Sequence, residues 1–351
     1  MQYRFLSKFI IAVLICFGVF QESQAQDIHF SQFYASPLTL NPAMTGLMQG
    51  CYRGAVNYRN QYPELPGYAY STVAASFDMP LMRGMIGNDF AGAGLQIFND
   101  RQGDGALNNL SILGSAAYHK SLDRSGNFLI SIGVQGGWVN KSVDFTSLFF
   151  ESQLDGNEFN PNISNGEAIE DNNINYFDLR AGAILSARVN KNVGVYGGGA
   201  YFHITEPNES FLGDEENTLG ARLVGHAGAE INATDRLSIN PNVIYMTQSA
   251  ARELVIGANV GYQFDGGRNG SGTAMYIGAS YRLSEVPGDA VIALVGAEFN
   301  SLKFGISYDI NISTLKVASL GQGGIELSMG YEFDCAPQGK RGYPPVSCPR
   351  F

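Results

Sequence analysis

Hydrophobic and polar residues alternate along much of this chain. From residue 302 to residue 313, apolar side chains occupy the even positions, and glycine, polar or charged residues occupy the odd ones. The run from 325 to 333 has the same period, with apolar residues at the odd positions. Because successive side chains of a strand point to opposite faces, each run predicts a strand with one apolar and one polar face.

Similar runs recur along most of the sequence and are separated by clusters of Gly, Asn, Asp and Pro, which favour turns. Their length suits strands that cross a membrane. We predict an all-β fold, an antiparallel transmembrane β-barrel of about 14 strands over residues 51–334. The expected strands are 51–60, 67–78, 89–100, 106–119, 127–141, 176–189, 193–204, 220–232, 236–248, 252–265, 273–284, 289–300, 301–313 and 323–334.

The connections between these strands have unequal lengths. The two longest, 142–175 and 205–219, both follow odd-numbered strands, whereas tight turns such as Asn300-Ser301 follow even-numbered ones. Bacterial outer-membrane barrels keep short turns in the periplasm and long loops outside. We therefore expect the long loops to be extracellular and both termini to be periplasmic.

The first 25 residues do not fit the strand pattern. Arg4 and Lys8 precede an apolar run over residues 9–20, and the segment ends in Ser23-Gln24-Ala25. This order of basic, apolar and small residues predicts a secretory signal peptide that is cleaved after Ala25.

The composition excludes helical membrane spans and supports a barrel. No stretch after residue 25 approaches the roughly 20 apolar residues of a spanning helix. The chain has 43 Gly, 18 Tyr and 22 Phe with 15% charged residues, fewer than the roughly 25% of a typical soluble protein. The mean hydropathy of -0.05 is that expected when half of each strand faces lipid and half faces a wet lumen.

Charge is concentrated in two places. Both long loops are acidic, which indicates either a solvated rim or a docking surface for a basic or Ca²⁺-bearing partner. The polar faces of the strands carry charges of both signs, which suggests paired networks in the lumen. Its predicted members include Arg53, Arg180, Arg222, Glu230, Asp309 and Glu326.

The segment from 26 to 50 is polar, aromatic and contains proline, but it lacks strand alternation. It is expected either to plug the lumen or to lie in the periplasm. At the other end, residues 335–351 form a tail that is expected to be periplasmic.

Three cysteines remain after signal cleavage. A disulfide between Cys335 and Cys348 with Cys51 left over is one expectation, and three unpaired thiols are the other.

The sequence shows no catalytic centre. The four histidines are scattered, and neither G-x-S-x-G nor H-E-x-x-H nor C-x-x-C occurs. We expect neither enzymatic activity nor a cofactor, a metal site or a nucleic-acid partner.

Several motifs are similar to those of one known family. They include residues 27–34, Leu40-Asn41-Pro42-Ala43, residues 57–63 and the ending Cys348-Pro349-Arg350-Phe351. This pattern resembles the signature of the PorP/SprF family, outer-membrane proteins of the type IX secretion and gliding motility systems of Bacteroidetes. The motif residues singled out are Phe30, Ser31, Gln32, Tyr34, Asn41, Pro42 and Arg59.

The resemblance implies a non-enzymatic protein that helps export or anchor a large secreted cell-surface protein. Expected partners are the C-terminal domain of a type IX substrate or adhesin, other secretion components, and outer-membrane lipid. A plugged or gated channel for small or hydrophobic substrates is the alternative, and an outer-membrane hydrolase is a weaker one.

Overall fold

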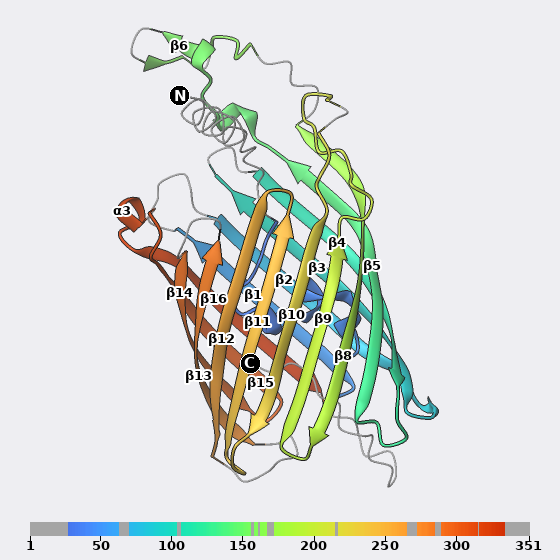
Figure 1. Ribbon diagram of the computed structural model, residues 1–351. Helices are drawn as coiled ribbons and strands as arrows, with labels where there is room; N and C mark the ends of the chain where they lie inside the picture. The colour runs from blue at the N-terminus through green and yellow to red at the C-terminus, as the bar shows by residue number, and fades with distance from the viewer. Residues whose placement is uncertain are drawn as a thin grey trace, which may run out of the picture.

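The computed structural model is a closed antiparallel β-barrel of fourteen strands (Figure 1). It describes residues 27–62, 70–103, 107–155, 158–160, 162–166, 172–214, 217–264, 272–284, 289–314 and 316–333. The expected signal peptide and the tail from 335, with Cys335 and Cys348, lie outside the described residues. Among those described, no helix is long and apolar enough to span a membrane.

Each strand pairs with its neighbour in the sequence, and β1 closes the barrel against β16. The prediction of fourteen strands is confirmed. The strands are β1 (Tyr52–Gln61), β2 (Tyr70–Ile86), β3 (Asp89–Gln102), β4 (Leu107–Ser121), β5 (Phe128–Ser142), β8 (Asn173–Asn190), β9 (Val193–Phe202), β10 (Arg222–Asn232), β11 (Leu237–Gln248), β12 (Ala251–Gln263), β13 (Thr273–Ser284), β14 (Ala290–Phe299), β15 (Leu302–Asn311) and β16 (Gln322–Phe333).

One strand extends further past its expected end than any other strand of the barrel. β2 continues to Ile86, eight residues beyond the expected end at Asp78. It keeps pairing with β3 as far as Leu81 and again at Ile86, with a register shift between them. Pro80 and Gly84 interrupt the pattern in the sequence, but a proline is tolerated at an irregular part of a ladder.

The two faces of the wall differ as the alternation predicts. On β15, Phe304, Ile306 and Tyr308 are exposed on the outer face, whereas Ser307 and Asp309 are buried on the inner face. The same contrast holds on β16. The outer face presents apolar side chains, as a lipid-facing surface requires.

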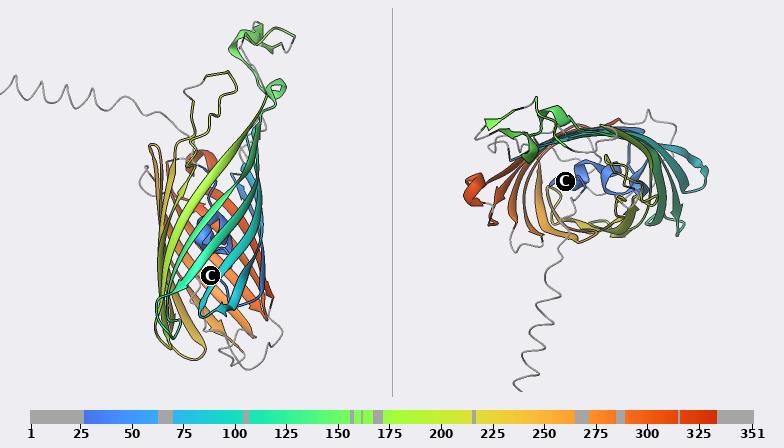
Figure 2. Two further views of the ribbon diagram at one scale, coloured as in Figure 1. Left: turned by 90° about the vertical axis from the view of Figure 1, so that its right-hand side faces the viewer. Right: turned by 90° about the horizontal axis from the view of Figure 1, so that it is seen from above.

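The two longest connections lie at the same end of the barrel. Those between β5 and β8 and between β9 and β10 project from one end, together with α3 (Lys316–Ser319), as Figures 1 and 2 show. We call this the long-loop end. The first of these loops contains η3 (Phe145–Ser147), η4 (Glu151–Gln153) and the hairpin of β6 (Leu154–Asp155) and β7 (Glu158–Phe159).

Residues 27–50, which we call the lumen segment, run inside the barrel (Figure 2). Their only regular elements are η1 (Phe33–Ala35), α2 (Pro37–Leu40) and η2 (Pro42–Met44). The side chains of the segment form the centre of the molecule's buried apolar cluster, where Leu40, Ala43, Met44 and Leu47 pack against the inner wall.

The lumen segment runs from one end of the barrel toward the other. Asp27 contacts His203 and Gln248, at the long-loop ends of β9 and β11, while Gly50 lies against Phe333 at the opposite end. The two ends of the described chain are therefore at opposite ends of the barrel. The segment threads through the lumen before β1 begins. The termini themselves lie outside the described residues, so the expectation that both are periplasmic stays a prediction.

Candidate functional site: the lumen segment and its anchors

The lumen segment has too little regular structure to satisfy its own backbone. Its elements are three or four residues long. A buried N–H or C=O group without a partner costs free energy comparable to a lost hydrogen bond. The wall must therefore supply donors and acceptors, and its charged side chains do so.

Three carboxylates of the wall accept hydrogen bonds from backbone N–H groups of the segment. Each comes from a strand position on the inner face, so its negative charge replaces the water that would otherwise solvate the N–H groups. The pairs are Glu326 with Ser31 N at 2.7 Å and Gln32 N at 3.0 Å, Asp78 with Gly46 N at 2.7 Å, and Glu332 with Gln49 N at 2.7 Å and Gly50 N at 2.6 Å.

Three arginines of the wall donate to backbone carbonyls of the segment in the same way. Guanidinium groups suit this task because they offer several N–H donors in a fixed fork. The pairs are Arg222 with Ile28 O at 2.9 Å, Arg53 with Met44 O at 3.0 Å and Leu47 O at 3.4 Å, and Arg83 with Met48 O, Gln49 O and Gly50 O.

An ion network surrounds Ser31. Asp309 on β15 accepts from Arg59 of β1 and from Arg282 of β13, both at 2.8 Å. The hydroxyl of Ser31 lies 2.8 Å from both oxygens of Asp309, and Arg59 also contacts Glu326 at 3.2 Å. The side chains of Arg59, Asp309 and Glu326 are at most 3% exposed, so a serine of the segment completes a buried charge cluster of the wall.

A second ion network holds the start of the segment. Asp27 lies 3.0 Å from His203 Nε2 and 3.2 Å from Arg222, and His203 Nδ1 lies 3.1 Å from Asp178, which pairs with Arg180. Burial acts to raise the pKa of Asp27, but Arg222 and His203 outweigh it and hold the pKa below its usual range. Burial acts to lower the pKa of His203, but Asp27 and Asp178 outweigh it and raise that pKa.

The middle of the segment is held by close backbone packing. A Cβ atom added to Gly133 would lie 2.4 Å from Pro42 O, and one added to Gly182 would lie 2.1 Å from Asn41 Oδ1. The Asn41 amide donates to the carbonyl oxygens of Ala183 at 3.2 Å and Gly199 at 3.1 Å. Glycine is required here because any side chain would push the segment off the wall.

All four histidines belong to this contact surface. His119 Nε2 lies 2.8 Å from Thr45 O, His226 Nε2 lies 3.1 Å from the Asn41 amide, and His203 pairs with Asp27. His29 is part of the segment and lies 3.2 Å from Glu253. Their positions are those of anchoring residues, and among the described residues no group of His, Cys, Asp or Glu could hold a metal ion.

The structure brings most of the residues singled out in the sequence to this one interface. Arg59, Asp309 and Glu326 meet Ser31 and Gln32 in one network, Arg180 and Arg222 belong to the second, and Arg53 pairs with Asp78 at 2.7 Å. The remaining motif residues also contact the wall: Phe30 packs with Ala74 and Phe98, the Tyr34 hydroxyl donates to Ala227 O at 3.2 Å, and Pro42 lies against Gly133.

One predicted residue stands apart. Glu230 lies on β10, and no ion pair joins it to another of the described residues. It lies four residues beyond His226 along β10, away from the long-loop end where Arg222 anchors the segment.

Other residues of the interface were missed. Arg83 falls in the part of β2 that the alternation does not predict, and Asp27 was read only as part of a motif. Glycines such as Gly133 and Gly182, which interrupt the inner faces of strands, indicate a close approach of another group. Their spacing in the sequence does not show which group that is.

The cysteine pattern also differs from one expectation. Cys51, at the end of the lumen segment, is in a disulfide. The prediction that Cys51 is the cysteine left over is therefore wrong. A pairing of Cys335 with Cys348 falls outside the described residues.

The fold is similar, at low sequence identity, to those of several solved structures, among them a transporter and a channel. The toluene transporter TbuX of Ralstonia pickettii is 11% identical over 84% of this chain and 93% of that chain, with a TM-score of 0.43. The monoaromatic hydrocarbon channel CymD is 13% identical over 86% of this chain and 93% of that chain, with a TM-score of 0.46. At these scores the similarity carries no inference about function.

The sequence itself gives a more specific result. None of the curated proteins with which it was compared is similar to it. A family model described as type IX secretion system membrane protein PorP/SprF matches residues 22–331, which include the lumen segment and all but the last two residues of the barrel wall. The chain therefore belongs to the PorP/SprF family of type IX secretion system membrane proteins.

Proposed function

We propose that this protein is a non-enzymatic outer-membrane component of type IX secretion that helps export or anchor a large secreted cell-surface protein. The occupied lumen is the observation that supports this function most directly. Residues 38–48 of the lumen segment are all buried inside the barrel. The protein's own chain therefore occupies the space through which a substrate would pass. A binding role on the outer surfaces suits such a barrel better than transport through it.

The long loops provide a surface for this role. The loops after β5 and β9 contact one another, with Phe145 edge-on to Phe211 at 6.0 Å and both Lys141 and Tyr176 bonded to Glu209 at 2.5 Å. We call the described residues within 143–166 and 203–214 the loop platform. Its most exposed apolar side chains are Phe149, Leu154, Phe159 and Leu212, at 48–68% exposure.

Acidic residues accompany these apolar side chains. Asp144, Glu151, Asp155 and Glu158 lie in the same loop as Phe149 and Phe159. Large exposed apolar groups beside charged ones mark surfaces that bind other proteins. The partner that fits is the C-terminal domain of a type IX substrate or adhesin with an apolar contact and basic residues around it.

The experiment is a pull-down of the secreted partner from detergent extracts of cells. The variant Phe149→Ser/Phe159→Ser/Leu212→Ser should recover at least tenfold less partner than the wild type. Val317→Ser/Leu320→Ser is the matched control. These residues are 81–82% exposed and lie at the same end of the barrel, in the connection between β15 and β16 that contains α3. Equal recovery with the platform variant and the wild type would refute the proposal.

A plugged or gated channel is the second candidate, since a separate non-strand segment fills the lumen. Single-channel conductance of the intact protein and of a variant lacking residues 27–48 tests it. A gated channel requires that the intact protein opens under some applied voltage. If only the deletion variant conducts, the segment is a permanent plug and the intact protein is not a gated channel.

A further inference from the structure

The loop between β9 and β10 begins and ends at one place on the barrel. His203 is its first residue, and Arg222 is the first residue of β10, where it pairs with Phe202 at the end of β9. The loop projects from the long-loop end (Figure 2), but the side chains of His203 and Arg222 are only 3% and 6% exposed. The base of this loop is therefore buried inside the barrel.

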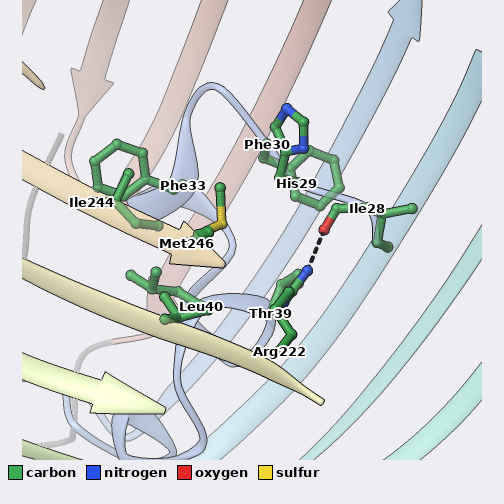
Figure 3. Close-up of a pocket in the computed structure, with 10 residues that line it drawn as sticks. Ile28, His29, Phe30, Phe33, Thr39, Leu40, Arg222, Ile244 and Met246 are labelled. Carbon is green, nitrogen blue, oxygen red and sulfur yellow. Dashed lines mark hydrogen bonds between the residues drawn. The ribbon is translucent and has the colours of Figure 1, made fainter. Parts of the chain in front are cut away.

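The first described residue of the lumen segment joins the two sides of this base. One carboxylate oxygen of Asp27 lies 3.0 Å from His203 Nε2 and 3.2 Å from Arg222 Nη1. Arg222 also donates to Ile28 O at 2.9 Å, as Figure 3 shows. Among the described residues, Asp27 is the only carboxylate within ion-pair distance of Arg222. The lumen segment thus supplies the negative charge that holds the base of the loop together.

The backbone of His203 has a conformation that depends on its surroundings. Its φ angle is +59°, in the left-handed region that residues other than glycine rarely adopt. Such a residue keeps this conformation only where the surrounding structure fixes it. Two carboxylates do so here, because Asp27 contacts the Nε2 side of the ring and Asp178 contacts the Nδ1 side at 3.1 Å. Loss of Asp27 removes one of these contacts at the residue where the loop begins.

Beyond its base, the loop is a narrow hairpin. The N–H group of Leu219 donates to Pro207 O at 2.8 Å, and the N–H group of Glu209 donates to Asn217 O at 2.9 Å. The two sides of the loop are therefore joined to each other, and a change of direction at the base moves both. Leu212 of the loop platform, which is 54% exposed, lies beyond these bonds and moves with them.

We propose that Asp27 is a positioning residue of the loop platform. Its carboxylate fixes the base of the β9–β10 loop, so the seated lumen segment holds Leu212 in the arrangement that binds the partner. Asp27 acts from inside the barrel, without touching the partner. The inference rests on the proposed function of the platform. It adds that binding outside and seating inside are coupled, and each favours the other by the same free energy.

Hydrogen exchange of the purified full-length protein in detergent tests the inference without the partner. In Asp27→Ala, exchange of residues 204–209 should accelerate at least tenfold, because His203 and Arg222 lose their shared carboxylate. Asp27→Asn should give a smaller acceleration, since the amide keeps a hydrogen-bond acceptor at this place but not the charge. Unchanged exchange of the loop in Asp27→Ala would overturn the inference.

Glu332→Ala is the matched control. Glu332 also accepts hydrogen bonds from the lumen segment, from Gln49 N and Gly50 N, but at the opposite end of the barrel. Its loss should leave exchange of residues 204–209 at the wild-type rate. Acceleration of equal size in Glu332→Ala and Asp27→Ala would overturn the inference, because any loosening of the segment would then disturb the loop. Far-ultraviolet circular dichroism and heat-modifiable gel mobility establish that each variant is folded.

A pull-down of the secreted partner separates this inference from the proposed function. Asp27→Ala should recover at least threefold less partner than the wild type or Glu332→Ala. Reduced recovery with unchanged exchange of the loop would overturn the inference and leave the proposed function standing. Accelerated exchange with undiminished recovery would support the positioning of the loop by Asp27 and refute the role of this loop in binding, which belongs to the proposed function.

Discussion

The two halves of the lumen segment are bound to the barrel wall by different kinds of interaction. Residues 27–36 contact the wall through charges, with Asp27 and Ser31 inside two ion networks. Residues 37–48 are held mainly by close packing, since the backbone around Pro42 lies against glycines of the wall and Leu38 and Leu47 are fully buried. Asp78 and Arg53 add hydrogen bonds to the backbone of this half, but no ion network of the wall includes one of its side chains. Charge pairs respond to pH and salt, whereas close packing does not. The first half is therefore the part of the segment that can be released.

A small pocket between the lumen segment and the wall, with Ile28, Phe33, Leu40, Arg222, Ile244 and Met246 in its lining, fits this difference (Figure 3). It adjoins the charged half, where the wall and the segment are joined by side chains rather than by backbone contact. The four predictions below test the contrast between the halves, from the largest expected effect to the smallest.

Asp309→Ala should have the largest effect. It leaves Arg59 and Arg282 without their shared carboxylate and Ser31 without its acceptor. Breaking a buried ion pair by removing one partner costs about 3–5 kcal/mol. Hydrogen exchange should accelerate over residues 28–32 and stay nearly unchanged over residues 42–47. Equal acceleration in both halves would contradict the contrast.

Loss of the disulfide at Cys51 should come next. Cys51 N–H donates to Phe333 O at 2.8 Å, and two further residues span at most about 7 Å, so Cys335 is within reach. We expect Cys335→Ser to lower the free energy of unfolding by about 2–4 kcal/mol.

Mass spectrometry after thiol labelling identifies the partner. Cys51 should become reactive in Cys335→Ser and stay protected in Cys348→Ser, which is the matched control. The reverse pattern would assign the partner to Cys348. The charged half of the segment should keep its exchange rates in either variant.

Gly133→Val should disturb the packed half. The added side chain would meet Pro42 O and Ala43 N, which are backbone atoms that cannot turn away. Overpacking of this kind costs about 1–3 kcal/mol. Exchange over residues 41–45 should accelerate while the ion networks persist. Gly114→Val is the control, since the nearest atom to its added Cβ is 3.9 Å away.

A change of pH should have the smallest effect and should act on the charged half. His203 has a raised pKa in the folded protein, so its charge stabilises the folded state fully below about pH 6.5, and this contribution is lost as pH rises through the folded pKa. Asp27 has a lowered pKa, so its contribution is present above about pH 4 and is lost as pH falls through its folded value.

Hydrogen exchange, corrected for the intrinsic pH dependence, checks this expectation. Opening of residues 27–30 should become easier as pH rises above neutrality, and His203→Gln should remove that dependence. Residues 42–47 should show no such change. A pH response of equal size in both halves would mean that the whole segment is released as one unit.

Much of the barrel follows from local pattern. Alternation on β15 predicted which side chains face inward, and it placed Asp309 and Glu326 on the inner face. It failed on β2, where Pro80 and Gly84 disturb the period although the strand continues with Arg83. A strand is a local object with a fixed period of two, so its position can be read from a short window.

The sequence predicted many of the residues of the candidate site but not the contacts between them. Charges of both signs on the polar faces indicated a network, and the motif residues of the segment were identified through the family resemblance. The sequence did not show that Glu326 would accept hydrogen bonds from two backbone N–H groups. Nor did it show that Gly133 would face Pro42 or that Gly182 would face Asn41. Each of these contacts joins residues that are distant in the sequence.

By itself, then, the sequence determined the strands, their inward and outward faces, their number and the family. The tertiary structure alone decided that the lumen segment enters the barrel, that Asp27 lies at the long-loop end, and that a pocket remains beside Arg222. The reason is that an irregular segment has no period of its own. Its position depends on which wall groups satisfy its backbone, and those groups are brought together only when β1 pairs with β16 and the barrel closes.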